Sequence, residues 1–403
     1  MRRTRAGATT GGGADIYKFL GHTKFISGAR AMEHIPYELA GFDAGRPLVI
    51  AEPGIAKKGL AKKFLSALAD SNMTVGALFD DAPPYASVAV IGDLGALFRD
   101  RGCDSLVALG DGPAVDIAKG VNMLVTTGVD SIMEFEGENL LSKRLKPSVV
   151  VPACGATGLE AANRATIEGR TFVSDFLFPD LVCIDARMVK SASPEAIAGA
   201  SLAAFAHCVE AAAFPHNNPM TDMYAHAAIQ FLYEHMRRLP RSPGTKGCVA
   251  LANAFAMAGV VFSNAPAGIV HLLATALADE TGVPAGIAMG ILLPCYLDYK
   301  TGVMKEDVRE ELLLAMAGID EYCATPEKER ALKSIALLKG LLRGMKESLP
   351  RTLADLRIPP YKLKAAAELA AARGDGRVDL KSCTAILDRA CSAASTGQEG
   401  FPQ

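Results

Sequence analysis

Two histidines lie on otherwise apolar helical stretches in the second half of the chain. His207 belongs to the run AAFAHCVE at residues 203–210, and His271 belongs to GIVHLLAT at 268–275. An imidazole can bind a metal ion or move a proton near neutral pH, so either histidine could serve a reaction. A single histidine on an apolar helix is more often a hydrogen-bonded core residue, and Glu210, one turn from His207, is a candidate partner.

A glycine-rich turn after an apolar run is the second chemical signal. LVAL at 106–109 predicts a buried strand, and GDGPAVDIAK at 110–119 follows it, with Pro113 where a helix can begin. A helix that starts directly after a strand presents free N–H groups and a positive dipole end, which favour phosphate. Glycines also begin helices for structural reasons alone, so this turn by itself leaves both interpretations open.

A second loop of the same kind follows a later apolar run. VVVPACGATGLE at 149–160 predicts a strand that leads into a turn rich in glycine and threonine. Two such loops that leave adjacent parallel strands would face one crevice. The pair therefore indicates a phosphate site more strongly than either loop alone.

The elements that must position these residues divide the chain in two. Strand-like runs at 48–51, 75–79, 106–109, 149–151 and 181–184 alternate with helical patterns such as 57–69 and 88–101, which predicts a parallel sheet covered on both faces. Alanine-rich helical stretches follow from Pro194. They cover 194–213, 219–238, 246–262, 267–279, 305–317, 326–347, 360–373 and 380–394. We expect an α/β domain over 1–190, with a loose tail at 1–14, and an all-helical domain over 191–403.

Composition restricts the class of protein. Lys and Arg number 42 against 44 Asp and Glu, and this balance argues against a nucleic-acid or membrane-surface partner. Nine cysteines without a C-x-x-C pair indicate reduced thiols, so we expect a cytoplasmic protein. The basic N-terminus lacks an apolar signal region. The uncharged stretch after Lys246 predicts two buried helices that break at 264–266 rather than a membrane span.

From about residue 20 to 395 the chain resembles the iron-containing alcohol dehydrogenases, the group III metal-dependent type. Their loop GGGSxxDxAK corresponds to residues 110–119, and their PTTAGTGSE corresponds to PACGATGLE at 152–160. Their DAxxHxxE corresponds to residues 203–210, and their HxxxH followed by VPHG corresponds to 271–286. The resemblance implies a Rossmann-like dinucleotide-binding domain, then an all-helical metal and substrate domain, in homodimers or larger homo-oligomers.

The metal site of the family is incomplete here. The resemblance implies that one Asp and three His hold iron or zinc, at positions that are Ala203, His207, His271 and Ala285 in this chain. Two neutral imidazoles without a carboxylate leave the charge of a cation uncompensated, so we expect a vestigial site without iron or zinc. Substitute carboxylates remain an open alternative, and the candidates are Glu210, Asp279 and Glu280.

The remaining site residues follow from the same resemblance. The second histidine of HxxxH, a proton-relay or substrate group in the family, is Thr275 here, so the predicted catalytic residues are His207, His271 and Thr275. AEPG at 51–54 resembles the strand end TDPG, whose acidic residue holds the ribose, and this favours NAD over NADP. The predicted cofactor-binding residues are Glu52, Gly110, Asp111, Gly112, Asp116, Cys154 and Thr157. Asp111 puts a carboxylate beside the pyrophosphate unless it turns to solvent, and Pro113 removes one N–H donor.

Three functions fit these residues. The first is an NAD-dependent oxidoreductase that acts on a small alcohol or carbonyl compound without the metal, as the resemblance implies for relatives that reduce maleylacetate. The second is a catalytically degenerate homologue kept as a binding or assembly subunit. A cyclising lyase similar to the dehydroquinate synthases is a third, but those also resemble metal enzymes.

Overall fold

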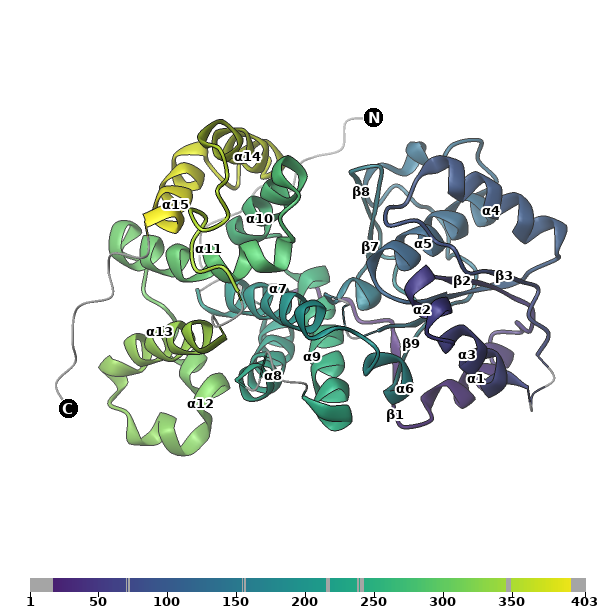
Figure 1. The fold of residues 1–403 in the computed structure, drawn as a ribbon, viewed down its shortest axis with the longest axis horizontal. Helices are drawn as coiled ribbons and strands as arrows, with labels where there is room; N and C mark the ends of the chain where they lie inside the picture. The colour runs from purple at the N-terminus through teal and green to yellow at the C-terminus, as the bar shows by residue number, and fades with distance from the viewer. Residues whose placement is uncertain are drawn as a thin grey trace.

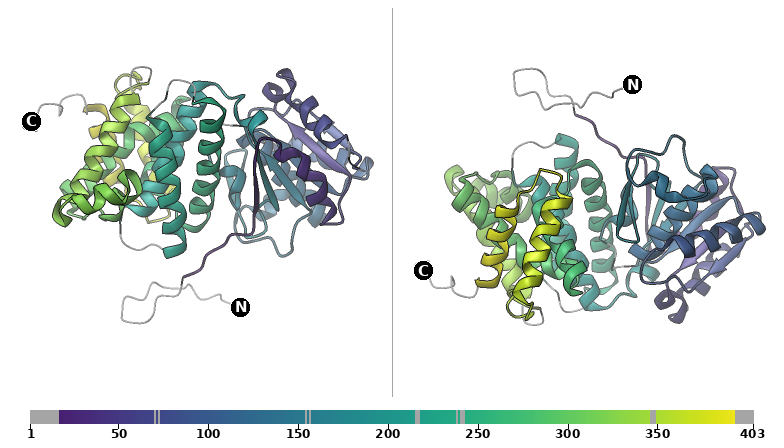
Figure 2. Two further views of the ribbon diagram at one scale, coloured as in Figure 1. Left: turned by 90° about the horizontal axis from the view of Figure 1, so that it is seen from below. Right: turned by 90° about the horizontal axis from the view of Figure 1, so that it is seen from above.

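The computed structural model describes residues 17–392 except 70, 72, 154, 156, 215–217, 238, 240–242 and 346–348. The predicted tail at 1–14 and residue Cys154 lie outside the described residues. An α/β part and a helical part lie side by side (Figure 1), and both further views separate them in the same way (Figure 2).

The α/β part is built on six parallel strands in the order β1-β9-β6-β4-β2-β3. Their bounds are β1 (Lys24–Gly28), β2 (Pro47–Ala51), β3 (Ala77–Phe79), β4 (Ser105–Leu109), β6 (Ser148–Val151) and β9 (Leu181–Asp185). The sequence predicted all of them except β1. This strand pairs only with β9 at the sheet edge and is largely exposed, so it lacks an apolar run.

Alternating side chains of the central strands enter two separate cores. Val49, Val107 and Val149 pack with Phe64 of α3 (Leu60–Leu68) and with α1 (Ile35–Ala40) on one face. The opposite face packs under α4 (Val88–Asp100) and α5 (Gly112–Thr127), where Leu106 joins the core that continues into the helical part. The sheet is therefore covered on both faces, as its apolar strands predict.

The structure corrects the predicted helix 57–69. Two helices occupy that region, α2 (Pro53–Lys57) and α3, because Gly59 between them has a φ of +69°, which ends one helix before the next begins. A small second sheet was also missed. It contains β5 (Gly137–Glu138), β7 (Arg164–Ile167) and β8 (Arg170–Val173), and β7 and β8 form a hairpin. These short strands contain polar residues, so no apolar run marks them in the sequence.

Helices follow one another after α6 (Ala186–Val189). They are α7 (Pro194–Ala212), α8 (Pro219–Met236), α9 (Gly244–Asn264), α10 (Ile269–Thr281), α11 (Ala285–Tyr299), α12 (Glu311–Ala324), α13 (Glu327–Gly344), α14 (Pro360–Arg373) and α15 (Leu380–Ser392). The sequence missed α11, which is apolar on nearly all sides and contains Pro294. The predicted helix at 305–317 was placed too early, because a π-helical turn occupies Lys300–Met304 and α12 begins at Glu311.

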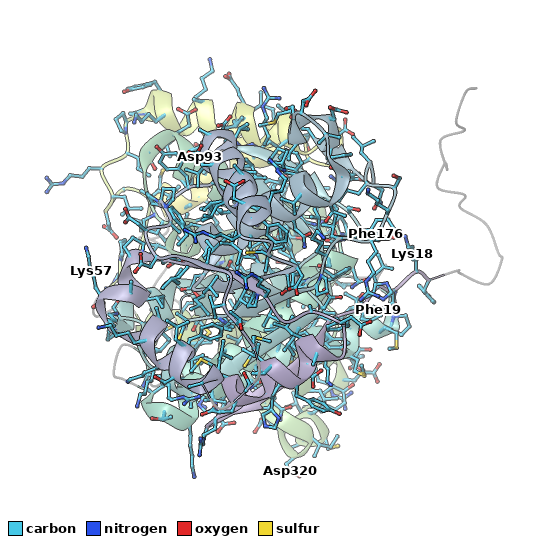
Figure 3. All side chains as sticks on the ribbon, turned by 90° about the vertical axis from the view of Figure 1, so that its right-hand side faces the viewer. Lys18, Phe19, Lys57, Asp93, Phe176 and Asp320 are labelled. Carbon is cyan, nitrogen blue, oxygen red and sulfur yellow. The ribbon has the colours of Figure 1, made fainter. Side chains whose placement is uncertain are left out.

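The apolar stretch after Lys246 forms two helices, as predicted. By length and composition α9 could cross a membrane, but two thirds of its most apolar window (67%) is buried inside the protein, as in a core helix. Leu20 donates its N–H to the Asn264 side chain at the end of α9. The N-terminal segment with Lys18 and Phe19 thus leads onto the helical part, on the side where Phe176 lies (Figure 3).

Pairs of glycines let helices meet backbone to backbone near the crevice. A Cβ on Gly286 of α11 would overlap the carbonyl oxygen of Gly199 in α7. A Cβ on Gly259 of α9 would likewise overlap the carbonyl oxygen of Gly158 in the second glycine loop. These contacts fix α11 against α7, and α9 against the second glycine loop, at separations that no larger residue permits.

We expect Gly286→Ala to lower the free energy of unfolding by about 1–3 kcal/mol, because the new methyl group has no space and the backbone must shift. Gly340→Ala is the control: a Cβ added to this helical glycine in α13 would have no atom within 4 Å, so alanine should raise stability by about 0.5–1 kcal/mol. Urea unfolding measures both. Equal stability of the two variants would show that the α7–α11 contact tolerates a methyl group.

Candidate active site

The two histidines of the motifs meet in the helical part. The His207 ring on α7 and the His271 ring on α10 have centroids 4.8 Å apart. Phe262 on α9 lies against both, with its centroid 4.4 Å from that of His207 and 4.7 Å from that of His271. Two residues that are far apart in the chain therefore share one aromatic cluster, as the resemblance implies.

Burial keeps both imidazoles neutral. It lowers the pKa of His207 to about 3, with the positive charge of Arg164 as a second cause. Burial also lowers the pKa of His271 well below its usual value, and His207, Arg164 and Arg373 add to the effect. The Nδ1 atom of His271 is buried without a hydrogen-bond partner. A neutral imidazole has one nitrogen that donates a hydrogen bond and one that accepts, so this atom is available to a ligand.

The residues at this site do not fit the family's metal ion. Ala203, 2% exposed, lies one turn before His207 on α7, and Ala285 is the first residue of α11. Neither methyl group can bind a cation. Within the described part of the chain, no group of three or more His, Cys, Asp or Glu residues could hold a metal ion. Two imidazoles are too few for the tetrahedral shell that zinc prefers.

The candidate substitute carboxylates have other contacts. Glu210 accepts N–H groups from Val270 at 2.8 Å and His271 at 3.2 Å, and so caps the start of α10. Burial raises the pKa of Glu210 to about 7. Asp279 forms an ion pair with Arg373 at 2.6 Å. Glu280 belongs to no cluster with metal-binding composition among the described residues.

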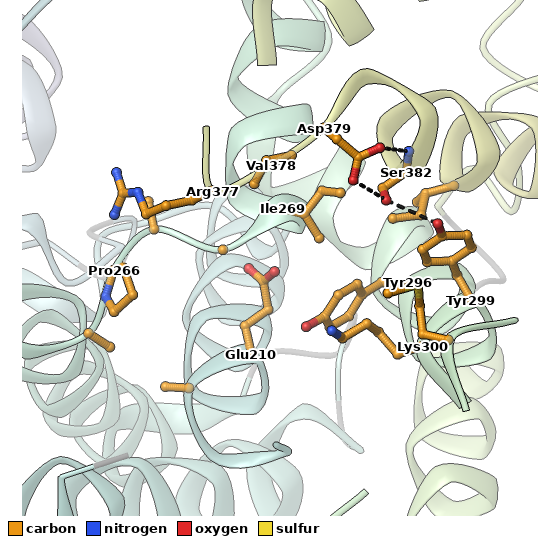
Figure 4. Close-up of a pocket in the computed structure, with 16 residues that line it drawn as sticks. Glu210, Pro266, Ile269, Tyr296, Tyr299, Lys300, Arg377, Val378, Asp379 and Ser382 are labelled. Atoms are coloured by element: carbon orange, nitrogen blue, oxygen red, sulfur yellow. Dashed lines mark hydrogen bonds between the residues drawn. The ribbon is translucent and has the colours of Figure 1, made fainter. Parts of the chain in front are cut away.

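A pocket of about 340 Å³ is lined in part by the connection between α9 and α10. The Glu210 carboxylate points into this pocket, and Arg377 reaches past Pro266 at its side (Figure 4). Asp379, Ser382 and Tyr299 form a hydrogen-bonded chain at the opposite wall. Neither His207 nor His271 lines this pocket, so it is separate from the histidine cluster although Glu210 contacts the backbone at the start of α10.

The first glycine loop already holds a carboxylate of the protein. Glu52, directly after β2, accepts the Asp111 N–H at 2.8 Å, and burial raises its pKa. Gly110 has a φ of +133°, and a Cβ there would lie 2.7 Å from the Glu52 carboxyl carbon. The glycine is therefore required by both the turn and the close approach of Glu52.

Asp111 turns toward the second loop and not toward solvent. Its Oδ2 lies beside Gly155 of that loop, the backbone amides of Ala153 and Gly155 favour its charged form, and its Oδ1 is buried without a partner. Burial raises the pKa of Asp111 well above its usual value, and the nearby charges of Glu52 and Glu160 raise it further. Amides of both loops that could bind a phosphate thus contact carboxylates of the protein itself.

Asp116 lies deeper than the crevice. It is 8% exposed on α5, and burial raises its pKa to about 7, while the charge of Lys119 and the backbone amide of Thr166 act in the opposite direction. Lys119 donates to the carbonyl oxygens of Leu159, Ala162 and Arg164 at 3.2, 2.7 and 2.7 Å. These two residues hold the segment that follows the second loop. Cofactor contact by Asp116 stays a prediction.

The other predicted residues lie near these loops and histidines. Gly112 opens α5 with free space around its Cα, and Thr157 is half-buried in the second loop. The Thr275 hydroxyl donates within its own helix, to His271 at 3.0 Å or Leu272 at 3.1 Å, and keeps only its acceptor capacity for a ligand. Their roles stay predictions.

Sequence reasoning missed Arg164 and Phe262. The Arg164 guanidinium carbon lies 3.8 Å from the centroid of the Phe262 ring, a cation–π contact, and an Nη atom donates to the Phe262 carbonyl at 3.1 Å. Arg164 begins β7, so the unpredicted hairpin brings it to the histidine cluster. The signal in the sequence was a charged residue soon after the second glycine loop.

Comparisons with known proteins agree with this geometry. The family description "Iron-containing alcohol dehydrogenase" matches residues 22–186, and "Fe-containing alcohol dehydrogenase family, C-terminal" matches residues 197–382. Together they span most of the chain. The chain belongs to the iron-containing alcohol dehydrogenase family. It is an alcohol dehydrogenase-like oxidoreductase.

Individual members of the iron-containing alcohol dehydrogenase family are similar over most of their length. Alcohol dehydrogenase 4 of Schizosaccharomyces pombe is 26% identical, over 75% of this chain and 72% of its own. Long-chain-alcohol dehydrogenase 1 of Geobacillus thermodenitrificans is 25% identical, over 83% and 85%. The crystal structure of a 1,3-propanediol oxidoreductase matches this structure with a TM-score of 0.83 at 24% sequence identity. The match covers 93% of this chain and 100% of that chain, so the two proteins share the same fold.

We expect the protein purified with added iron or zinc to retain far less than one ion per chain, because two imidazoles are the only remaining ligands of the family site. Ala203→Asp combined with Ala285→His should restore a four-ligand shell and near-stoichiometric metal. Elemental analysis after dialysis measures both. Stoichiometric metal in the unmodified protein, removed only by a chelator, would contradict the expectation.

Proposed function

We propose that this protein is an NAD-dependent oxidoreductase that interconverts a small alcohol and its carbonyl compound without a tightly bound metal. The observation that carries the proposal is the meeting of two glycine loops at adjacent strand ends. The loops leave β4 and β6, which pair directly, so both face the crevice outside the carboxyl ends of the sheet. Dinucleotides bind at this place in open α/β sheets.

The first loop fits the pyrophosphate of NAD in shape. The tight turn at Gly110 and the free space at Gly112 let a phosphate approach the start of α5, where the helix dipole is favourable. Glu52 at the end of β2 is suited to ribose hydroxyls and would repel a 2′-phosphate, which supports NAD over NADP. When bound, NADH supplies the hydride.

The histidines supply the proton chemistry of the proposal. His271 offers a buried, unpartnered Nδ1, and His207 lies beside it, so one neutral imidazole can donate a hydrogen bond to the substrate oxygen. As the carbonyl is reduced, its oxygen gains negative charge and takes a proton. The neutral ring relays this proton: one nitrogen gives a proton to the oxygen while the other nitrogen takes one from solvent, so the ring never becomes an anion. No step depends on a metal ion, since the residues do not fit one.

Turnover of NADH in the presence of a chelator tests this proposal. We expect absorbance at the NADH band to fall when the protein, kept in EDTA, meets short aldehydes or keto acids. His271→Ala should lower kcat/KM by about 10²–10⁴-fold, the usual contribution of a general acid. His34→Ala, which changes an exposed histidine outside the cluster of His207, His271 and Phe262, is the control. Equal loss in both variants, or activity that EDTA abolishes, would contradict the mechanism.

We expect Asp111→Asn to tighten NAD binding by about tenfold, because one carboxylate near a pyrophosphate costs roughly 1–4 kcal/mol at about 4 Å. NADH fluorescence titration measures the affinity. In the unmodified protein the affinity should fall as pH rises, since ionised Asp111 opposes the phosphate and its raised pKa brings this ionisation toward neutral pH.

The amide side chain of the Asp111→Asn variant cannot ionise, so the affinity of that variant should change less with pH. Asp93→Asn removes an exposed charge on α4 (Figure 3) and should leave both the affinity and its pH dependence unchanged. An Asp111→Asn variant that binds NAD as weakly as the unmodified protein would show that this carboxylate does not lie beside the bound pyrophosphate.

A degenerate binding or assembly subunit is the second candidate. The carboxylates of Glu52 and Asp111 on the loop amides, together with the methyl groups of Ala203 and Ala285, favour it. A ligand at about 100 times its Kd raises stability by ~2.7 kcal/mol. No thermal shift at millimolar NAD, for both the unmodified protein and Asp111→Asn, would support this candidate over the enzyme.

The free thiols support a reducing setting for the reaction. Six described cysteines are free thiols and four of them are buried, which supports a reducing compartment such as the cytoplasm; the six are Cys103, Cys183, Cys208, Cys323, Cys383 and Cys391. A small alcohol or carbonyl compound is the proposed partner, with no nucleic acid and no membrane, and the chain is proposed to act as a homodimer or larger homo-oligomer.

A further inference from the structure

Arg164 is a positive charge at the histidine cluster without an acidic partner. No carboxylate among the described residues lies within ion-pair distance of its guanidinium. The Nε atom of Arg164 is buried and has no hydrogen-bond partner, although the side chain as a whole is only half-buried. A buried N–H donor of a charged group is costly when it has no acceptor, and arginine does not lose its proton in proteins.

The position of this charge is unusual for an apolar cluster. Arg164 stacks on Phe262, and the same ring contacts His207 and His271. The cluster therefore carries a fixed positive charge on the protein, at the ring that also contacts both imidazoles. Two polar atoms here, Nε of Arg164 and Nδ1 of His271, are buried without a partner.

A second cation lies at the neighbouring pocket that Glu210 lines. Arg377, between α14 and α15, donates its Nε only to the nearby Gly374 carbonyl, and its positive charge lowers the pKa of Arg164. Glu138 of β5 has the opposite influence on Arg164 but forms no ion pair with it. Two arginines from the two parts of the chain thus repel each other, and no ion pair among the described residues offsets that repulsion.

From this geometry we infer that the substrate carries an acidic group, a carboxylate or a similar oxyanion, which Arg164 binds while the histidines meet the carbonyl or hydroxyl group. The inference rests on the proposed oxidoreductase function and names its substrate class. The planar guanidinium has parallel N–H donors that match a carboxylate in two-point contact. A bound oxyanion would give the unpartnered Nε an acceptor and would compensate the charge of Arg164.

An acidic group on the substrate also affects how the carbonyl is presented for reduction. In relatives that hold a metal the cation draws electrons from the substrate oxygen, and this chain lacks the ligands for one. An acidic substrate held by Arg164 gains its binding energy away from the reacting carbon, which fixes the carbonyl against the histidines. The site therefore favours a short aldehyde or ketone that also carries a carboxylate over a neutral aldehyde of equal length.

A matched pair of substrates tests the inference. The probes are 4-oxobutanoate, which is anionic, and its methyl ester, which is neutral and reacts at the same aldehyde. With NADH we expect the unmodified protein to reduce the acid with a kcat/KM at least about tenfold above that of the ester. Arg164→Gln should lower kcat/KM for the acid by about tenfold to hundredfold and change the ester by less than about threefold.

Two further variants keep the result interpretable. Arg164→Lys retains the positive charge, so it should recover part of the preference for the acid even if Arg164→Gln is poorly folded. Arg99→Gln removes one exposed positive charge on α4, far from the crevice, and should change neither substrate. A loss for the acid that Arg99→Gln reproduces would overturn the inference, because it would reflect net charge alone.

A binding measurement separates this inference from the proposed function. Succinate, which has no aldehyde to reduce, should raise the melting temperature of the unmodified protein and not that of Arg164→Gln. If succinate binds through Arg164 but neither probe is reduced, the oxyanion site stands and the oxidoreductase proposal fails. If the ester is reduced as well as the acid and succinate does not bind, the oxidoreductase proposal stands and the inference is overturned.

Discussion

A charge buried in a protein must be compensated, and this constraint shapes the whole crevice. Ala203 and Ala285 occupy the positions where the resemblance to the family implies an acid and a third imidazole, so their side chains offer a divalent ion no compensating charge. Two alanines fill those positions, and both imidazoles stay neutral because burial lowers their pKa values. The positive charge that remains belongs to Arg164, which the protein fixes by stacking on Phe262 and by one carbonyl contact.

The same constraint operates with opposite sign at the glycine loops. Free amides at strand ends attract anions, and here Glu52 and Asp111 are the anions that reach them. The pKa values of both carboxyl groups rise, chiefly because burial disfavours ionisation. Affinity for a phosphate at these loops thus depends on how easily the carboxylates lose charge or move. The two ends of the crevice carry groups of opposite charge: arginine lies near the histidines, and carboxyl groups lie near the glycine loops.

The scaffold that holds these groups is rigid where helices meet. Gly286 against Gly199 and Gly259 against Gly158 bring backbones into direct contact. The second of these contacts joins α9, which carries Phe262, to the loop that precedes Arg164. Lys119 fastens the same segment through three carbonyl groups. Arg164, Phe262 and the loops therefore form one connected unit, and the position of the arginine is set by packing that extends into both parts of the chain.

The sequence by itself determined the central strands, most helices and the two histidine motifs, because long apolar runs and their periodicity indicate directly which residues are buried. It could not determine β1 or the β7–β8 hairpin, whose short strands carry exposed and polar residues, nor α11, which is apolar on nearly all sides. Tertiary structure alone decided the direction of Asp111, the cap that Glu210 makes on α10, and the contact of Arg164 with Phe262. These depend on which distant backbone groups and rings come within a few ångströms, and no local pattern encodes that distance.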